Sequence, residues 1–115
     1  MIAKKENWKN FPMSTERERL YISKHYDINE SIKIQRGYLP ESMEDKWFIF
    51  YQDNWLYFHR SWTGYCIYKV KLKMTDEGAD IDEAWVTRDT EQYRNKVSDE
   101  DINILLSLIE SKLLK

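Results

Sequence analysis

The chain has 115 residues, 18 basic and 20 acidic side chains, and a net charge of −2 at neutral pH. This length is typical of one domain, so we expect residues 1–115 to fold as a unit. Neither half of the chain is strongly basic, which argues against binding of duplex nucleic acid. Single-stranded nucleic acid is less firmly excluded, because it can stack on aromatic residues, although it too requires a positive groove.

Three features of the sequence bear on the cellular compartment. Residues 1–13 lack the apolar core of a signal peptide, and we interpret them as a flexible N-terminal tail. No apolar run reaches the length of a membrane span. A single cysteine, Cys66, cannot form an internal disulfide, which fits a reducing compartment. We therefore expect a cytoplasmic protein that does not bind a membrane.

Two elements are predicted in the first third of the chain. Residues 15–25 begin with the sequence Thr-Glu-Arg-Glu, a possible capping box that predicts a helix on the surface of a sheet. Residues 31–36 alternate between apolar and polar side chains, with Ile32 and Ile34 on one side. That period of two predicts a half-buried strand, which ends at Gly37.

The central stretch, residues 46–73, contains three of the four phenylalanines and the only cysteine. Two aromatic runs, residues 47–52 and 55–60, flank the polar pair Asp-Asn, and this pattern predicts a hairpin. A two-residue turn places Phe48 opposite His59. If the next loop, residues 61–64, is a simple connection, the partners are then His59 with Cys66, Tyr57 with Tyr68, and Trp55 with Val70.

Because side chains alternate along a strand, these registers divide the central strands into two faces. One face is expected to be apolar throughout and to carry the main core: Phe48, Phe50, Trp55, Tyr57, His59, Cys66, Tyr68, Val70 and Leu72. The other face is expected to be apolar at one end and exposed to solvent at the other: Trp47, Ile49, Tyr51, Leu56, Phe58, Arg60, Tyr65, Ile67, Lys69, Lys71 and Lys73. A loop of odd length would exchange the partners, so this division depends on the register.

The last third of the chain predicts a strand and a helix. Residues 80–87 are expected to form a fourth meander strand, with three acidic residues opposite Lys69, Lys71 and Lys73. Ser98 is the expected helix cap, and three acidic residues follow where the helix dipole favours them. Apolar side chains recur at helical spacing: Ile102, Leu105, Leu106, Ile109 and Leu113.

This order of elements predicts the fold class. We expect an α+β protein in which an antiparallel meander sheet of four to five strands packs with an N-terminal and a C-terminal helix. Trp47, Tyr51, Phe58 and Tyr65 would form an exposed aromatic patch unless a helix covers them, and such a patch marks an interaction surface. Edge strands and exposed aromatic residues are also compatible with a dimer.

The densest cluster of reactive and polar side chains is the candidate ligand site. It comprises His59, Arg60, Ser61, Trp62, Thr63 and Gly64. An arginine can hold a phosphate or carboxylate through two hydrogen bonds, and an indole can stack on a flat ring. The alternative is purely structural: His59 is a core histidine, Gly64 supplies a turn conformation, and Trp62 covers a sheet edge.

Other chemistry is poorly supported by the sequence. Ser61 lies two residues from His59, but no nucleophile elbow surrounds it. Two histidines and one cysteine have no metal-ligand spacing, and no glycine-rich phosphate loop is present. Cys66 is expected to be buried and inert, although a neighbouring histidine can lower a thiol pKa. We therefore expect no metal and no cofactor.

Three segments carry a resemblance to a family. They are W-F-I-F-Y at residues 47–51, W-L-Y-F-H-R-S-W-T-G at residues 55–64 and E-Q-Y at residues 91–93. The chain resembles a small bacterial family whose members share similar segments, over about half of its length. The resemblance implies a loose association with ADP-ribose-processing neighbours, and it brings no established catalytic residues.

These observations lead to three functional hypotheses. The leading one is a non-enzymatic binding domain that recognises a protein partner or an anionic small molecule, with Arg60 as the anchor and Trp62 as the stacking ring. The second is an enzyme acting on a nucleotide or ADP-ribose-like ligand, with His59 as general base. The third is a toxin-neutralising or other protein-interaction module, which the acidic C-terminal half favours slightly.

Overall fold

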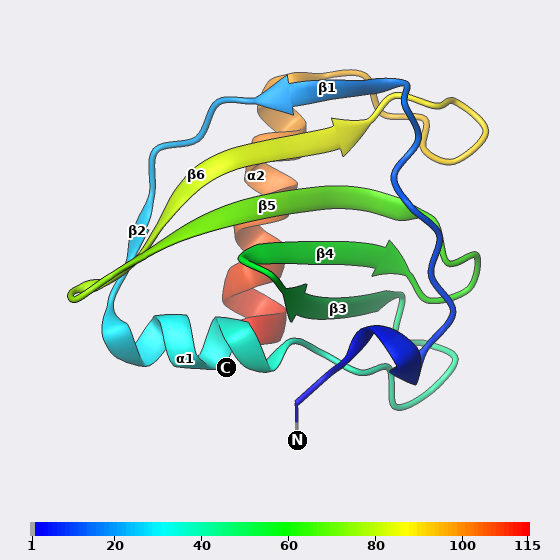
Figure 1. Ribbon diagram of the computed structural model, residues 1–115. Coiled ribbons are helices and arrows are strands. Elements are labelled where there is room, and N and C mark those ends of the chain that lie inside the picture. Colours follow the sequence, from blue (N-terminus) through cyan, green and yellow to red (C-terminus); the bar gives the residue numbers. More distant parts are fainter. Residues whose placement is uncertain (1) are drawn as a thin grey trace.

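One antiparallel sheet organises the structure, a computed structural model that describes residues 2–115 (Figure 1). Two helices and a short 3-10 turn complete it, and the predicted α+β class with a meander sheet is confirmed. The strands run in the spatial order β1-β6-β5-β4-β3, and β2 also pairs with β6. The strands are β1 (Arg17–Leu20), β2 (His25–Tyr26), β3 (Trp47–Gln52), β4 (Trp55–Arg60), β5 (Cys66–Thr75) and β6 (Gly78–Thr87).

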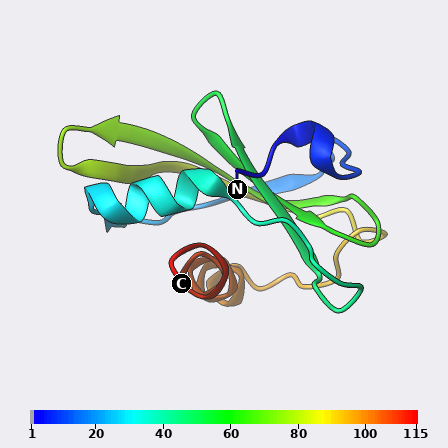
Figure 2. The same ribbon diagram turned by 90° about the horizontal axis from the view of Figure 1, so that it is seen from below.

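The helices lie on one side of this sheet. Helix α1 spans Ile28–Arg36, and α2 spans Ser98–Leu108 and continues as a π-helical turn, Ile109–Leu113. Figure 2 shows α2 below the sheet and the 3-10 turn, Lys5–Asn7, on the opposite side. We call the side that packs on α2 the core face, and the opposite side the pocket face.

Both expectations for the first third of the chain were wrong in detail. Residues 15–25 do not form a helix: they include β1 and the first residue of β2, and both strands extend the sheet by pairing with β6. Residues 31–36 do not form a strand, because they belong to α1. The overlooked signal is a capping box, in which Asp27 accepts a hydrogen bond from the Glu30 amide at 2.8 Å and Glu30 accepts one from the Asp27 amide at 3.0 Å.

The predicted β3–β4 hairpin is confirmed in extent, turn and register. Phe48 lies opposite His59, and Asp53 and Asn54 form the two-residue turn. Both turn residues have positive φ, 52° and 71°. That pair of left-handed residues is typical of the type I′ turns that suit the twist of a hairpin.

A β-bulge changes the next register. His59 lies opposite Cys66 as predicted, but the preceding residue, Phe58, pairs with Tyr68. Strand β5 therefore has one extra, unpaired residue between Cys66 and Tyr68. Tyr57 therefore lies opposite Lys69 rather than Tyr68, and Trp55 lies opposite Lys71 rather than Val70. A bulge of this kind exchanges the two faces of a strand beyond it.

The bulge also decides which face carries the core. The expectation that the face of Phe48 would hold the main core is wrong. The main core lies on the core face and includes Trp47, Ile49, Leu56, Phe58, Tyr68, Val70, Leu72, Leu105, Ile109 and Leu113. The expected aromatic patch is therefore not an open surface, since Trp47 and Phe58 are buried and Tyr51 and Tyr65 are half-buried against this core. A smaller cluster of Ala3, Phe48 and Phe50 lies on the pocket face.

The C-terminal half follows the predicted plan with two exceptions. The fourth meander strand is confirmed as β6, with Lys71 opposite Glu83 and Lys73 opposite Asp80, but Lys69 lies opposite Trp85 and not opposite an acidic residue. Helix α2 starts where expected, but the hydroxyl of Ser98 does not cap it. That hydroxyl donates instead to a carboxylate oxygen of Glu18 at 2.7 Å, which ties the start of α2 to β1.

A buried carboxylate attaches α2 to the sheet. Asp101 is fully buried, and its Oδ1 accepts hydrogen bonds from Tyr68 at 2.9 Å, Tyr93 at 2.7 Å and Asn95 at 2.9 Å. Its Oδ2 lies 2.8 Å from Nη1 of Arg88 in an ion pair. Tyr93 belongs to the E-Q-Y segment noted in the sequence, so that segment has a structural role here.

Candidate functional site

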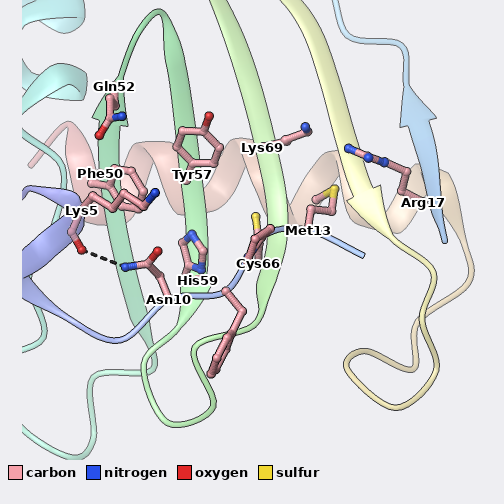
Figure 3. A pocket seen from close by; sticks show the side chains of 12 residues that line it. Lys5, Asn10, Met13, Arg17, Phe50, Gln52, Tyr57, His59, Cys66 and Lys69 are labelled. Carbon is pink, nitrogen blue, oxygen red and sulfur yellow. Dashed lines mark hydrogen bonds between the residues drawn. The ribbon is translucent and has the colours of Figure 1, made fainter. Parts of the chain in front are cut away.

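A cavity of about 370 Å³ lies on the pocket face, between the sheet and residues 5–13 (Figure 3). We call residues 5–13 the N-terminal segment. The cavity is lined by β3, β4 and β5 below, by β1 at one side and by the N-terminal segment above. It is of the size that suits a small molecule with one ring system.

The floor of the pocket is aromatic. Phe50 stacks on Tyr57 with ring centroids 4.9 Å apart, and on His59 with centroids 5.5 Å apart and ring planes 13° apart. The thiol of Cys66 completes the floor next to His59. Three flat rings in one layer form a surface on which a planar ligand can stack.

The rim of the pocket is cationic. Lys5, Arg17 and Lys69 line it, and no acidic side chain does. Within residues 2–115, none of these three cations forms an ion pair. Burial lowers the pKa of Lys69, and the neighbouring positive charge of Arg17 lowers it further. Glu83 opposes these effects in part, but neither cation forms an ion pair within residues 2–115, which favours an incoming anion.

Two irregular features of the chain place these cations. Lys69 lies on the pocket face only because the bulge shifts β5 by one residue relative to β4. Arg17 reaches the rim because residues 17–20 form an edge strand rather than a helix. In Figure 3 the side chains of Lys69 and Arg17 extend toward each other from β5 and β1.

The N-terminal segment is held to the pocket by three hydrogen bonds to the β4–β5 loop. The indole of Trp8 donates to the Ser61 carbonyl at 2.8 Å, and Lys9 Nζ donates to the Trp62 carbonyl at 2.9 Å. The amide of residue 11 donates to the Gly64 carbonyl at 2.8 Å. The segment interpreted as a tail thus lies against the sheet, while its flexibility stays a prediction.

His59 is a neutral, buried part of the floor. Its side chain is 2 % exposed, and Nδ1 lies 2.9 Å from the Gly64 carbonyl, which can only accept a hydrogen bond. Nδ1 therefore carries the proton, and the unprotonated Nε2 has no hydrogen-bond partner. Burial lowers the pKa of His59, and the positive charge of Lys5 lowers it further. The imidazole is thus uncharged at neutral pH.

The other residues of the predicted site point elsewhere. Arg60 lies over the ring of Trp47, 4.5 Å from its centroid, on the core face. Ser61 is buried, and its hydroxyl donates to the Asp45 carbonyl at 2.6 Å. The indole of Trp62 is exposed and donates to the Met43 carbonyl at 2.7 Å.

The last two residues of that cluster complete the loop. The hydroxyl of Thr63 accepts a hydrogen bond from the Tyr65 amide at 3.3 Å, and Gly64 adopts a positive φ of 82°. Of the six residues, the structure therefore places only His59 in the lining of the pocket. Gly64 lies next to it and is connected through its carbonyl, which accepts hydrogen bonds from His59 and from the amide of residue 11. That all six bind one ligand stays a prediction.

Catalytic and metal chemistry finds little support in this pocket. Burial raises the pKa of the Cys66 thiol to about 12, so the thiol is protonated at neutral pH and is a poor nucleophile. Within residues 2–115 no group of three or more His, Cys, Asp or Glu side chains is arranged to hold a metal ion. The arrangement can bind a ligand through charge and stacking, and it shows no nucleophile paired with a base.

The cations on the rim were not found from the sequence. Lys5 lies in the segment interpreted as a tail, Arg17 lies in the segment interpreted as a helix, and Lys69 was assigned to the other face. The sequence did hold a signal for Arg17. Residues 17–20 read Arg-Glu-Arg-Leu, and such alternation of positive and negative side chains is compatible with an exposed edge strand. No local pattern revealed the bulge that places Lys69.

Comparisons with known proteins add no relative to this description. The chain matches no family model, no curated protein and no solved structure. Among the helices in residues 2–115, none combines the length and the apolar character needed to cross a membrane.

Proposed function

We propose that this protein is a non-enzymatic binding domain that holds an anionic small molecule with a flat ring in the pocket beneath the N-terminal segment. One observation carries the proposal: three cations without ion-pair partners surround an aromatic floor, and no carboxylate lines the same pocket. In a chain with a net charge of −2, such a local excess of positive charge selects for anions.

The two halves of the ligand would be recognised by different forces. A flat ring would stack on Phe50 and Tyr57, where aromatic contact contributes beyond the area that is buried. A phosphate or carboxylate would accept hydrogen bonds from Arg17 and Lys69 at the rim. Its negative charge would also favour the protonated form of Lys69, which burial and Arg17 now disfavour.

The geometry favours binding over catalysis. His59 is the natural candidate for a general base, since its Nε2 is unprotonated. A base also requires a partner that it can activate, and the neighbouring Cys66 is a protonated, buried thiol. The enzyme hypothesis therefore lacks its second group, whereas the binding hypothesis requires only the stacked rings of the floor and the cations of the rim.

A thermal-shift screen tests the proposal. The ligands are nucleoside monophosphates, NAD, ADP-ribose, aromatic carboxylates and simple anions, each added to the purified chain. A ligand at 100 times its dissociation constant stabilises the folded state by about 2.7 kcal/mol. For a domain of this size, that raises the melting temperature by roughly 10 °C or more.

Three variants make the screen specific. Arg17→Ala and Lys69→Ala should abolish the shift caused by a ligand that carries both a ring and a negative charge. Lys33→Ala is the matched control, because Lys33 is exposed on α1, away from the pocket. A flat screen, or a shift that all three variants retain, would reject this pocket as a site for anionic ligands.

A further inference from the structure

The cations of the pocket belong to a larger pattern on the same face of the sheet. The registers place Tyr57 of β4 opposite Lys69 of β5, Lys69 opposite Trp85 of β6, and Trp85 opposite Arg19 of β1. Directly opposite residues share a face in an antiparallel sheet. Ring and cation thus alternate across four neighbouring strands, and Figure 3 shows Tyr57 and Lys69 side by side at the start of this row.

A second row repeats part of the pattern. Trp55 of β4 lies opposite Lys71 of β5, and Lys71 lies opposite Glu83 of β6. The cations also lie over the rings: Lys69 Nζ is 4.8 Å from the centroid of Trp55, and the guanidinium of Arg17 is 5.8 Å from that of Trp85. Both tryptophans are half-buried and keep part of their surface in solvent.

The charge of this face differs from that of the whole chain. Five cations lie on it, and none of them forms an ion pair within residues 2–115: Arg17, Arg19, Lys69, Lys71 and Lys73. The registers place two carboxylates on this face, and a third, Asp82, lies at the bulge of β6 and lines a surface pocket with Arg19 and Glu83. Asp80 Oδ1 lies 2.6 Å from Nδ1 of His25, and Glu83 accepts a hydrogen bond from the Trp85 indole at 2.7 Å. The face is therefore positive, although the chain carries a net charge of −2.

We infer that the pocket face binds single-stranded nucleic acid. Neighbouring strands are about 4.8 Å apart, so successive rings in a row are roughly 10 Å apart with a cation between them. A polymer with one negative charge and one flat base in each unit matches this alternation, because phosphates pair with cations while bases stack on rings. The inference goes beyond a small-molecule pocket, since it uses Arg19, Lys71 and Trp85, which do not line that pocket.

Fluorescence anisotropy with a labelled 12-nucleotide oligothymidylate tests the inference on the full chain. Each phosphate contact in a single strand contributes about −0.7 to the slope of log affinity against log salt. Three to five contacts therefore weaken binding roughly 20- to 130-fold between 50 and 200 mM salt. Lys71→Ala should weaken binding and reduce that slope, whereas the control Lys33→Ala on α1 should change neither.

The aromatic contribution needs its own variants. Trp85→Ala should weaken binding about 5- to 150-fold with an unchanged salt slope, since one stacked base contributes about 1 to 3 kcal/mol. Trp85 is partly buried, so Trp85→Phe serves as the second variant: it keeps a ring in the sheet and should retain most of the affinity. Circular dichroism identifies any variant that has lost its fold.

Several results would overturn the inference. These are no binding at 50 mM salt, equal affinity for an abasic strand of the same length, or equal affinity for thymidine monophosphate. The last result would leave the small-molecule pocket intact, because binding would then end at one nucleotide. The opposite result is tight binding of the 12-nucleotide strand without binding of any mononucleotide. That result would support nucleic-acid binding on the pocket face and reject the pocket as a small-molecule site.

Discussion

The imidazole of His59 lies almost parallel to the ring of Phe50, with 5.5 Å between the ring centroids and 13° between the planes. This stack fixes the histidine in the pocket floor, while the Gly64 carbonyl accepts its Nδ1 proton. A second proton on this ring would place a positive charge in a buried site beside the positive charge of Lys5. Protonation of His59 is therefore unfavourable in the folded state, and the stability of the pocket should depend on pH.

The first prediction concerns stability in acid. The pKa of His59 is lowered in the folded state, so between its folded value and the unfolded value of about 6.5 only the unfolded chain binds the proton. The free energy of unfolding should then fall as the pH drops below about 6.5. Urea unfolding measured between pH 7.5 and 5 checks this, and His59→Gln should remove the part of the slope that His59 causes.

The other histidine supplies the control with the opposite sign. The hydrogen bond that His25 donates to the Asp80 carboxylate raises the pKa of His25, so its stabilising effect is present below the unfolded value and is lost as the pH rises through the folded value. His25→Gln should therefore steepen the loss of stability in acid. Parallel curves for wild type and His59→Gln would show that the buried imidazole does not govern the response.

The second prediction concerns the carboxylate that holds α2. Asp101→Ala leaves the Arg88 guanidinium and the hydroxyls of Tyr68 and Tyr93 without their shared partner. Removal of one member of a buried ion pair costs about 3 to 5 kcal/mol, and we expect the lower end because the Arg88 side chain is 16 % exposed and keeps its ion pair with Glu18 at 2.7 Å. Urea unfolding measures the loss.

Asp99 is the matched control for that experiment. It lies in the same first turn of α2 but is exposed. Asp99→Ala removes a favourable helix-dipole interaction alone, so it should cost about 0.3 to 1 kcal/mol. Equal losses from the two variants would show that the hydrogen-bonded cluster around Asp101 contributes little.

The β3–β4 hairpin could be predicted from a short stretch of sequence. The turn at Asp53 and Asn54 was readable because two polar residues separate two aromatic runs, and the register of the hairpin follows from the length of that turn. Residues 31–36 carry two conflicting signals, because the alternation of Ile32 and Ile34 is typical of a strand whereas the capping box of Asp27 and Glu30 begins a helix. In the helix, Ile34 is buried and Ile32 is half-exposed, so the two do not share a face.

The site depended on features that no short pattern encodes. A single extra residue in β5, between Cys66 and Tyr68, moved Lys69 to the pocket face. Such a bulge is determined by how the two strands pack and not by a short sequence pattern. The position of Arg17 depends on pairing with Thr87, a residue distant in the sequence. The structural alternative described His59 as a core histidine, and the residue is buried, but it lines the pocket with an unpartnered Nε2. Its place in the floor of stacked rings depends on the whole sheet.

The third prediction concerns the type I′ turn. Asn54 has a φ of 71°, which asparagine tolerates better than other residues with a side chain. Asn54→Ala should therefore reduce stability by about 1 kcal/mol, whereas Asn54→Gly should be neutral or stabilising despite the loss of the hydrogen bond from Tyr51 at 3.2 Å. Urea unfolding of both variants measures the difference, and equal effects would show that the backbone conformation is not strained.

The last prediction concerns the contact between Gly64 and the N-terminal segment. Gly64 has a φ of 82°, and a Cβ at this position would lie 3.0 Å from Cγ of Lys9 and 3.1 Å from the ring of Phe11. Gly64→Ala should therefore strain the loop and push the segment away from the pocket. Amide hydrogen exchange of Phe11, whose N–H donates to the Gly64 carbonyl, should become at least tenfold faster.

Thr63→Ala is the control, because Thr63 is exposed and next to the same turn. It should leave the exchange of Phe11 nearly unchanged, since its hydroxyl accepts only a local hydrogen bond from the Tyr65 amide. The same experiment decides between the tail inferred from the sequence and the packed segment in the structure. If the Phe11 amide exchanges freely in the wild-type chain, the segment is a flexible tail, the roof of the pocket is open, and ligands must be held by the sheet alone.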